Sequence, residues 1–257
     1  MRLVPLFAFL LALIGVSPAK ACGKNFSRSC SDSVPVVPER ELQLLREWRA
    51  GEVVSIEAVK AFGIERCFGT ATLEEAGVLP RMRGKSMPEG CPVVPSELRY
   101  VRTLHKDDQG HIRIGEMVCN KAIAADLVEI FRQLYDAGYP IERMVLIDNY
   151  DADDERSMQA NNSSCFCFRK VAGFQTLSHH ALGMAVDINT LHNPYVKRRA
   201  DGSLFIQPST AGPYADRSKP SAYKIERGDL CYRLFISHGF SWGGNWKSLK
   251  DYQHFEK

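Results

Sequence analysis

The sequence SHHALGMAVDIN, residues 178–189, holds the densest group of chemically useful side chains in the chain. From residue 184 to 189 apolar side chains alternate with small or polar ones, which predicts a strand with Asp187 on the face opposite the buried one. Gly183 permits a bend just before that strand, so His180 can fold back until its imidazole meets the carboxylate of Asp187. These groups are good zinc ligands. A single His–Asp pair also fits a surface histidine beside a strand aspartate.

The C-terminal stretch offers a third candidate ligand and a free carboxylate, which a His–Asp pair lacks. It reads SWGGNWKSLKDYQHFE over residues 241–256, and Asp251 precedes His254 by three positions. On one turn of helix or in a tight loop, these two side chains face the same way. A catalytic zinc site needs three protein ligands, which leave one position for a water molecule whose pKa falls to about 7. It also needs an unbound carboxylate that takes the water's proton and returns it to the leaving amine.

Both stretches resemble one known family. Residues 178–187 match the pattern S-x-H-x-x-G-x-A-x-D, the metal motif of the D-Ala-D-Ala carboxypeptidase and L-alanyl-D-glutamate endopeptidase family of zinc peptidases. Residues 251–255, DYQHF, are similar to its second motif, in which an acidic base precedes the last histidine ligand by three. Residues 150–164 look like a further segment of one branch, so the resemblance runs from about Leu98 to Glu256.

Carried over by position, the resemblance implies a complete zinc site with a general base. The implied ligands of Zn²⁺ are His180, Asp187 and His254, and the implied base is Asp251. The residue spacing in the first motif assigns the metal to His180 rather than to its neighbour His179.

The chain departs from the family at the group that stabilises the oxyanion. Many relatives place an arginine directly after the strand that ends near Tyr150, where it can bind the oxyanion of the tetrahedral intermediate. Asp151 occupies that position here. We predict Arg156 as the substitute, with Arg169 as the alternative, although either residue also fits an ordinary salt bridge.

The resemblance implies hydrolysis of peptidoglycan stem peptides, with removal of terminal D-alanine as the first hypothesis. Cleavage between L-alanine and D-glutamate is the alternative within the family. A non-catalytic wall-binding module with structural zinc is a second class, and a hydrolase of other peptides is a third. The free carboxylate of Asp251 favours an enzyme, because a structural zinc site has no need of a base.

The remaining pattern predicts an α+β fold in which a small mixed or antiparallel sheet carries the zinc, flanked by helices. Periodicity and caps predict helices at 39–49, 55–62 and 120–137, the last capped by Asn120 and ended by Gly138. Alternation predicts a hairpin at 98–114 and a buried strand at 144–147. The predicted organisation is a signal peptide at 1–21, a small helical N-terminal subdomain and linker at 22–95, and a zinc peptidase domain at 96–257.

The first residues predict export to the periplasm or cell envelope. Met1-Arg2 is a basic start, Leu3 to Val16 is an apolar run too short to span a membrane, and Ala19-Lys20-Ala21 resembles a cleavage site. Cleavage there leaves Cys22 first, so a lipid anchor is an alternative. No later stretch is long and apolar enough to cross a bilayer.

The net charge of the chain bears on nucleic-acid binding, and its cysteine content bears on disulfide formation. Loss of Arg2 and Lys20 lowers the formal charge from +3 to +1, which gives no electrostatic footprint for nucleic acid. The basic run at 197–199 is more simply a solvated loop. Export of a chain with eight cysteines predicts disulfides, although 105 pairings are possible.

Overall fold

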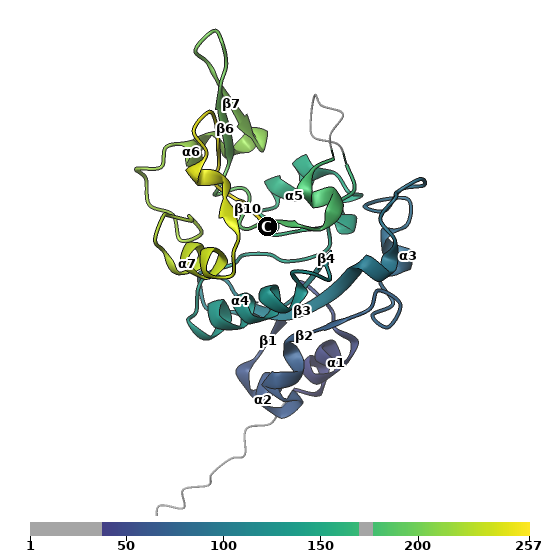
Figure 1. The fold of residues 1–257 in the computed structure, drawn as a ribbon. Helices are drawn as coiled ribbons and strands as arrows, with labels where there is room; N and C mark the ends of the chain where they lie inside the picture. Colours follow the sequence, from purple (N-terminus) through teal and green to yellow (C-terminus); the bar gives the residue numbers. More distant parts are fainter. Residues whose placement is uncertain (1–37, 170–176) are drawn as a thin grey trace, which may run out of the picture. The chain divides into compact units, whose positions relative to one another are not determined.

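A computed structural model describes residues 38–169 and 177–257, in which helices accompany three small antiparallel sheets (Figure 1). This arrangement agrees with the predicted α+β class. The largest sheet has the strand order β1-β4-β3-β2. Its strands are β1 (Val53–Val54), β2 (Gly69–Ala71), β3 (Leu98–Lys106) and β4 (Ile112–Asn120).

The hairpin predicted at 98–114 forms the centre of this sheet. Strands β3 and β4 pair over their full length of nine residues each, which is longer than the alternating pattern indicated. At the turn, the carboxylate of Asp107 accepts hydrogen bonds from the N–H groups of Gln109 and His111, at 3.1 and 2.9 Å. The prediction of a hairpin is therefore confirmed, and Asp107 closes it.

Helix α4 (Ala124–Asp136) packs against this hairpin and confirms the long predicted helix. Its apolar stripe lies in the main core with side chains of α7 (Leu230–Ser237) and β10 (His254–Glu256). Phe235 of α7 stacks on Phe255 of β10 with ring centroids 4.2 Å apart. The core therefore ties the helical layer to the strand that carries the last predicted ligand.

The start of α4 differs from the prediction. Asn120 is the last residue of β4, and its side-chain oxygen accepts a hydrogen bond from the N–H of Ala122 at 3.0 Å, in the turn that follows. Ile123 occupies the N-cap position and supplies no side-chain hydrogen bond. The predicted cap is wrong because β3 pairs with β4 as far as Asn120 and so delays the helix.

Helices α1 (Glu39–Glu47) and α2 (Ile56–Phe62) confirm the two helices predicted near the start of the described chain. The hydroxyl oxygen of Ser55 caps α2 by accepting a hydrogen bond from the N–H of Ala58 at 3.2 Å. Strands β1 and β2 pair with β4 and β3. The largest sheet therefore contains strands from both sides of the boundary predicted near residue 95.

The strand predicted at 144–147 does not form. The N–H of Val145 donates to Oδ1 of Asn162, and the carbonyl of Val145 accepts from Nδ2 of the same side chain, each at 3.0 Å. The side-chain amide of Asn162 thus forms the two backbone hydrogen bonds that a neighbouring strand would otherwise form. The chain then continues into a short 3-10 helix, Ile147–Tyr150.

Two three-stranded sheets position the predicted site, with strand orders β5-β10-β8 and β7-β6-β9. Pairing of β5 with β10 places Asp187 opposite His254, and pairing of β6 with β9 places Tyr195 opposite Asp251. The strands are β5 (Ala185–Asp187), β6 (Tyr195–Arg198), β7 (Leu204–Gln207), β8 (Ser241–Trp242), β9 (Lys250–Asp251) and β10.

The remaining α-helices are short. They are α3 (Leu79–Met82), α5 (Asp154–Gln159) and α6 (Gly212–Ala215). Among the described residues, we find no helix with the length and apolar character needed to span a membrane.

The cysteines that the structure describes form no disulfide with one another, so the disulfide prediction is unsupported for them. All six of them are free thiols. Five lie in or against core clusters, with Cys67 in one, Cys91 against another, and Cys119, Cys165 and Cys231 together in the third, whereas Cys167 is buried outside these clusters. Pairing requires Cα atoms within about 7 Å and suitably directed side chains. Cys22 and the predicted signal peptide lie outside the described residues.

Gly183 bends the chain before β5, as predicted. Its φ is +66°, and a Cβ atom there would lie 2.6 Å from the backbone nitrogen of Asn120. Gly183→Ala is expected to lower the free energy of unfolding by about 2–5 kcal/mol, through backbone strain and steric overlap. Gly138 has a φ of +68° with no heavy atom within 4 Å of the added Cβ, so Gly138→Ala should cost only about 1–2 kcal/mol. Equal losses in urea titrations of the two variants would mean that the close approach at Gly183 is unimportant.

Candidate metal centre

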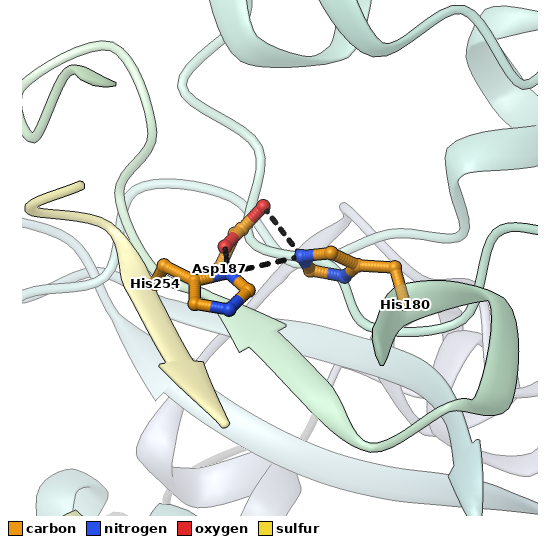
Figure 2. A group of neighbouring side chains, drawn as sticks. All are labelled: His180, Asp187 and His254. Atoms are coloured by element: carbon orange, nitrogen blue, oxygen red, sulfur yellow. Dashed lines mark hydrogen bonds and ion pairs between the residues drawn. The ribbon is translucent and has the colours of Figure 1, made fainter. Parts of the chain in front are cut away.

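The three predicted ligands come from segments that meet at one end of β5 and β10 (Figure 2). His180 lies on the 3-10 helix His179–Leu182, where the hydroxyl of Ser178 accepts a hydrogen bond from the N–H of His180 at 3.2 Å. Asp187 ends β5 and His254 begins β10, so antiparallel pairing brings them together. All three side chains are buried, and they form a cluster that can hold a metal ion.

The spacing of the donor atoms fits zinc. His180 Nε2 lies 3.2 Å from His254 Nδ1 and 3.1 Å from Asp187 Oδ2, and His254 Nδ1 lies 3.1 Å from Asp187 Oδ1. Ligand atoms about 2.0–2.1 Å from a tetrahedral zinc ion are separated by roughly 3.3 Å. Two imidazole nitrogens and one carboxylate are also a donor set typical of catalytic zinc. The residues present therefore match the ion in both chemistry and spacing.

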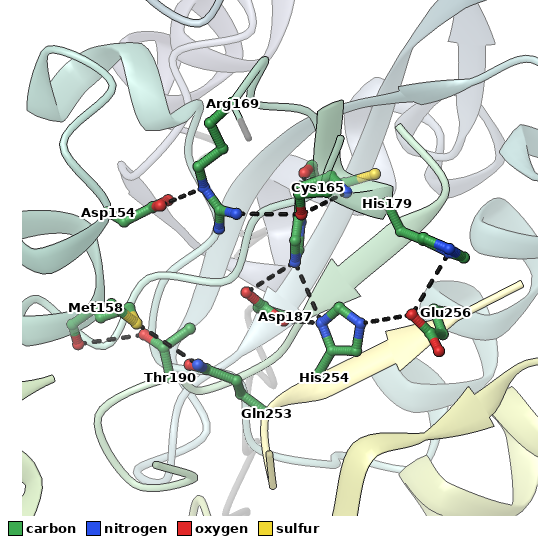
Figure 3. A network of polar contacts seen from close by, with 12 residues as sticks. Asp154, Met158, Cys165, Arg169, His179, Asp187, Thr190, Gln253, His254 and Glu256 are labelled. Carbon is green, nitrogen blue, oxygen red and sulfur yellow. Dashed lines mark hydrogen bonds and ion pairs between the residues drawn. The ribbon is translucent and has the colours of Figure 1, made fainter. Parts of the chain in front are cut away.

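The outer nitrogen of each imidazole has its own acceptor (Figure 3). His180 Nδ1 lies 2.7 Å from the backbone carbonyl oxygen of Cys165, and His254 Nε2 lies 3.1 Å from Glu256 Oε2. In neutral rings these outer nitrogens carry the protons and donate them, which leaves His180 Nε2 and His254 Nδ1 free to bind a metal. The Cys165 carbonyl and Glu256 therefore set the two tautomers that a metal site requires.

Without a metal ion, the cluster is held by its own charges. Burial by itself would raise the pKa of Asp187, but the contacts with His180 and His254 hold it well below its usual range. Burial opposes protonation of His254, but hydrogen bonds to Asp187 and Glu256 raise its pKa to about 10. Because zinc binds a neutral imidazole, the ion and a proton on Nδ1 of His254 exclude each other, while the proton on Nε2 is retained.

Asp251 lies beside this cluster at the end of β9. A tight loop between β9 and β10, rather than a helix, separates it from His254. Its Oδ1 atom is buried without a hydrogen-bond partner among the described residues, and burial raises the pKa of Asp251 to about 7. Gly243 allows the close packing, since a Cβ there would lie 2.6 Å from the carbonyl oxygen of Asp251. A carboxylate with one oxygen free of hydrogen-bond partners is suited to accept and return a proton.

The cluster and Asp251 line one cavity of about 800 Å³. The structure places Arg169 at its wall, whereas Arg156 lies outside this lining. The side chain of Arg156 is 57% exposed and pairs with Asp151 at 3.1 Å, which directs it to the surface. Of the two arginines predicted for the oxyanion, the structure therefore brings Arg169 and not Arg156 to the cavity.

Two contacts anchor Arg169 (Figure 3). Its guanidinium forms an ion pair with Asp154, and its Nη1 donates a hydrogen bond to the hydroxyl of Ser178 at 3.1 Å. Asp154 begins α5 and Ser178 caps the 3-10 helix that carries His180. The arginine is thus held between the two elements that border the cavity.

The sequence prediction missed Glu256 as part of the site. It follows His254 by two positions, and residues two apart on a strand share a face. The sequence HFE at 254–256 therefore already indicated that Glu256 could lie beside His254. Recognising it required the knowledge that this segment is a strand and that His254 presents Nδ1 to the cluster.

Glu256→Gln is expected to weaken zinc binding about 10–100-fold, as loss of a histidine's outer carboxylate partner typically does. Titration of the purified protein against a competing chelator measures this change. His179 is the other side chain near the carboxylate, with Nδ1 3.4 Å from Glu256 Oε2, so His179→Ala is the control and should leave the affinity unchanged. Equal affinities of wild type and Glu256→Gln would show that the carboxylate does not orient His254.

Comparison with known proteins gives one match. A family model described as D-alanyl-D-alanine carboxypeptidase matches residues 172–257. No curated protein and no solved structure matches the chain significantly. The matched segment contains His180, Asp187, Asp251 and His254 but not the earlier part of the resemblance, which stays a prediction. Residues 172–257 of this chain therefore match a metallopeptidase family model described as D-alanyl-D-alanine carboxypeptidase, and the match supports that family for this part of the chain.

Proposed function

We propose that this chain is an exported zinc peptidase that removes terminal D-alanine from peptidoglycan stem peptides. The observation that carries the proposal is the His180–Asp187–His254 cluster, which has the spacing of zinc ligands and opens into the same cavity as the unpaired carboxylate of Asp251. The family of residues 172–257 supports the substrate class. Export rests on the leader-like first 21 residues.

His180 Nε2, His254 Nδ1 and one oxygen of Asp187 would hold the ion. Bound zinc would polarise the scissile carbonyl and lower the pKa of a water molecule to about 7. Asp251 accepts the proton of the attacking water and then transfers it to the nitrogen of the departing residue.

Arg169 is the group that we assign to the oxyanion. Its guanidinium reaches the cavity while Asp154 and Ser178 hold it in place. A donor that is already oriented strengthens most as negative charge develops on the carbonyl oxygen, because no reorganisation is needed. Ser178 is thus a positioning residue and not a nucleophile.

Cleavage between L-alanine and D-glutamate by the same residues is the second candidate. It uses the same attack and the same proton transfers, and only the part of the peptide placed in the cavity differs. A non-catalytic zinc module is disfavoured by Asp251, since its buried Oδ1 atom without a hydrogen-bond partner costs free energy unless it has a role.

Mass spectrometry of digested muropeptides tests the proposal. Zinc-loaded protein is expected to shorten pentapeptides by one alanine. Release of a peptide that lacks the N-terminal alanine would support the second candidate instead. Binding of wall material with no cleavage by the zinc-loaded chain would favour the non-catalytic module.

A further inference from the structure

One face of the β6–β7 hairpin forms a wall of the cavity. Tyr195, Lys197 and Arg199 alternate along β6 and its continuation, so their side chains share a face. On β7, Gln207 lies opposite Tyr195 and Phe205 lies opposite Lys197. All five line the cavity, although the sequence had suggested a solvated loop for the basic run. In Figure 1 the hairpin extends away from the other strands, with β6 leading out and β7 returning.

This wall is joined directly to the reacting centre. β6 pairs with β9, which places Tyr195 opposite Asp251. Further along the wall, the rings of Tyr195 and Phe205 meet edge to face at 6.0 Å, and the guanidinium of Arg199 lies over Phe205 at 5.1 Å. The face is therefore an ordered surface that starts at the general base.

The charges of the wall are available to a ligand. Arg169, the third cation of the lining, is already paired with Asp154. The carboxylates of Asp187 and Glu256 are engaged by histidines. By contrast, Lys197 and Arg199 form no ion pair with any residue in the described ranges. A cavity with acidic residues at one end and two free cations along one wall is complementary to a peptide that carries a negative charge away from the cleaved bond.

We infer that the cavity-facing side of the β6–β7 hairpin binds a carboxylate of the substrate peptide through Lys197 and Arg199. This inference rests on the proposed peptidase function and specifies its substrate as an acidic peptide. Two residues of strand advance about 6.6–6.8 Å, so Lys197 and Arg199 lie roughly 7 and 13 Å along β6 from Tyr195. An extended peptide covers this distance in about two to four residues.

This reach connects the bound carboxylate to the bond that is cut. Consider a pentapeptide L-Ala-D-Glu-L-Lys-D-Ala-D-Ala, whose carboxylates are those of D-Glu and of the C-terminus. If the terminal D-Ala-D-Ala bond lies at the metal, the carboxylate two to four residues away is that of D-Glu. If the L-Ala-D-Glu bond lies there, the distant carboxylate is the C-terminal one. These two carboxylates lie on opposite sides of the bond that is cut, so a hairpin on one wall of the cavity serves only one of the two cases, and selective amidation identifies which.

Peptide binding to zinc-loaded Asp251→Asn protein tests the inference without turnover. Calorimetry with this pentapeptide is expected to show about threefold weaker binding or more for Lys197→Gln and for Arg199→Gln, and about tenfold for both together. Arg198→Gln is the matched control: Arg198 lies on the opposite face of β6, where its Nη1 donates to the carbonyl of Gly202 at 2.9 Å. Its affinity should stay within about twofold of the parent.

Amidated peptides identify the carboxylate. Amidation of the bound carboxylate should weaken binding of the pentapeptide to zinc-loaded Asp251→Asn protein. Adding both Lys197→Gln and Arg199→Gln to that protein should then cause no further loss of affinity for the amidated peptide. An equal loss of affinity with Arg198→Gln would overturn the inference. It would also be overturned if Lys197→Gln with Arg199→Gln weakened binding equally for the unmodified peptide and for both singly amidated peptides. Hairpin-dependent binding by a wild type that cleaves no pentapeptide would instead remove the proposed peptidase function and leave carboxylate binding in place.

Discussion

A chain carrying both His180→Ala and His254→Ala is expected to contain no zinc, against about one ion per wild-type chain, and to hydrolyse wall peptides no faster than background. The double change leaves Asp187 as the sole ligand, and one carboxylate does not hold zinc against water. Metal analysis of dialysed protein and muropeptide digestion give the two readouts.

Folding must be checked in the same experiment, because the double change strips a buried carboxylate of its partners. Breaking a buried ion pair costs about 3–5 kcal/mol. A His254→Gln variant preserves more of the packing, and its circular dichroism should match that of wild type while its zinc content falls. His238 pairs with Asp126 at 3.1 Å, outside the ligand cluster. The control that carries His179→Ala and His238→Ala should therefore retain zinc. Well-folded wild type without zinc, even after supplementation, would contradict the peptidase proposal.

Asp251→Asn is expected to lower kcat/KM about 10²–10⁴-fold, the usual contribution of a general base. Zinc content should not change, since Asp251 lies outside the ligand cluster. Asp251→Glu retains a carboxylate on a longer stem and should recover part of the rate. Undiminished hydrolysis by Asp251→Asn would remove this residue from the mechanism.

The same substitution is expected to change the pH dependence of stability in metal-free protein. The pKa of Asp251 is raised to about 7 in the fold from about 3.9 in the unfolded chain. Between these values the folded state binds more protons, so this group's contribution to stability falls as pH rises towards 7. Asp251→Asn does not lose this contribution. The melting temperature of Asp251→Asn minus that of wild type should therefore be larger at pH 8 than at pH 4. A difference that does not vary with pH would show that Asp251 is not held in an unfavourable charged state.

Local patterns of the sequence predicted most of the elements near the site. The alternating residues after Gly183 gave a strand, and the apolar stripe of α4 gave a helix, because both depend on the short repeat of side chains along the chain. The strand expected at 144–147 failed for a reason that no local pattern contains, since Asn162 binds the backbone of Val145 from a distance along the chain.

The sequence by itself predicted the candidate ligands and base, since His180, Asp187, Asp251 and His254 stand at spacings that resemble a family motif. Only the tertiary structure decided what surrounds them. Arg169 rather than Arg156 reaches the cavity because Asp154 and Ser178 hold it there. Glu256 orients His254, and the β6–β7 hairpin lines the cavity, because antiparallel pairing aligns β10 with β5 and β6 with β9. Such contacts depend on register between segments that are far apart in the chain, and residue spacing within one segment does not specify that register.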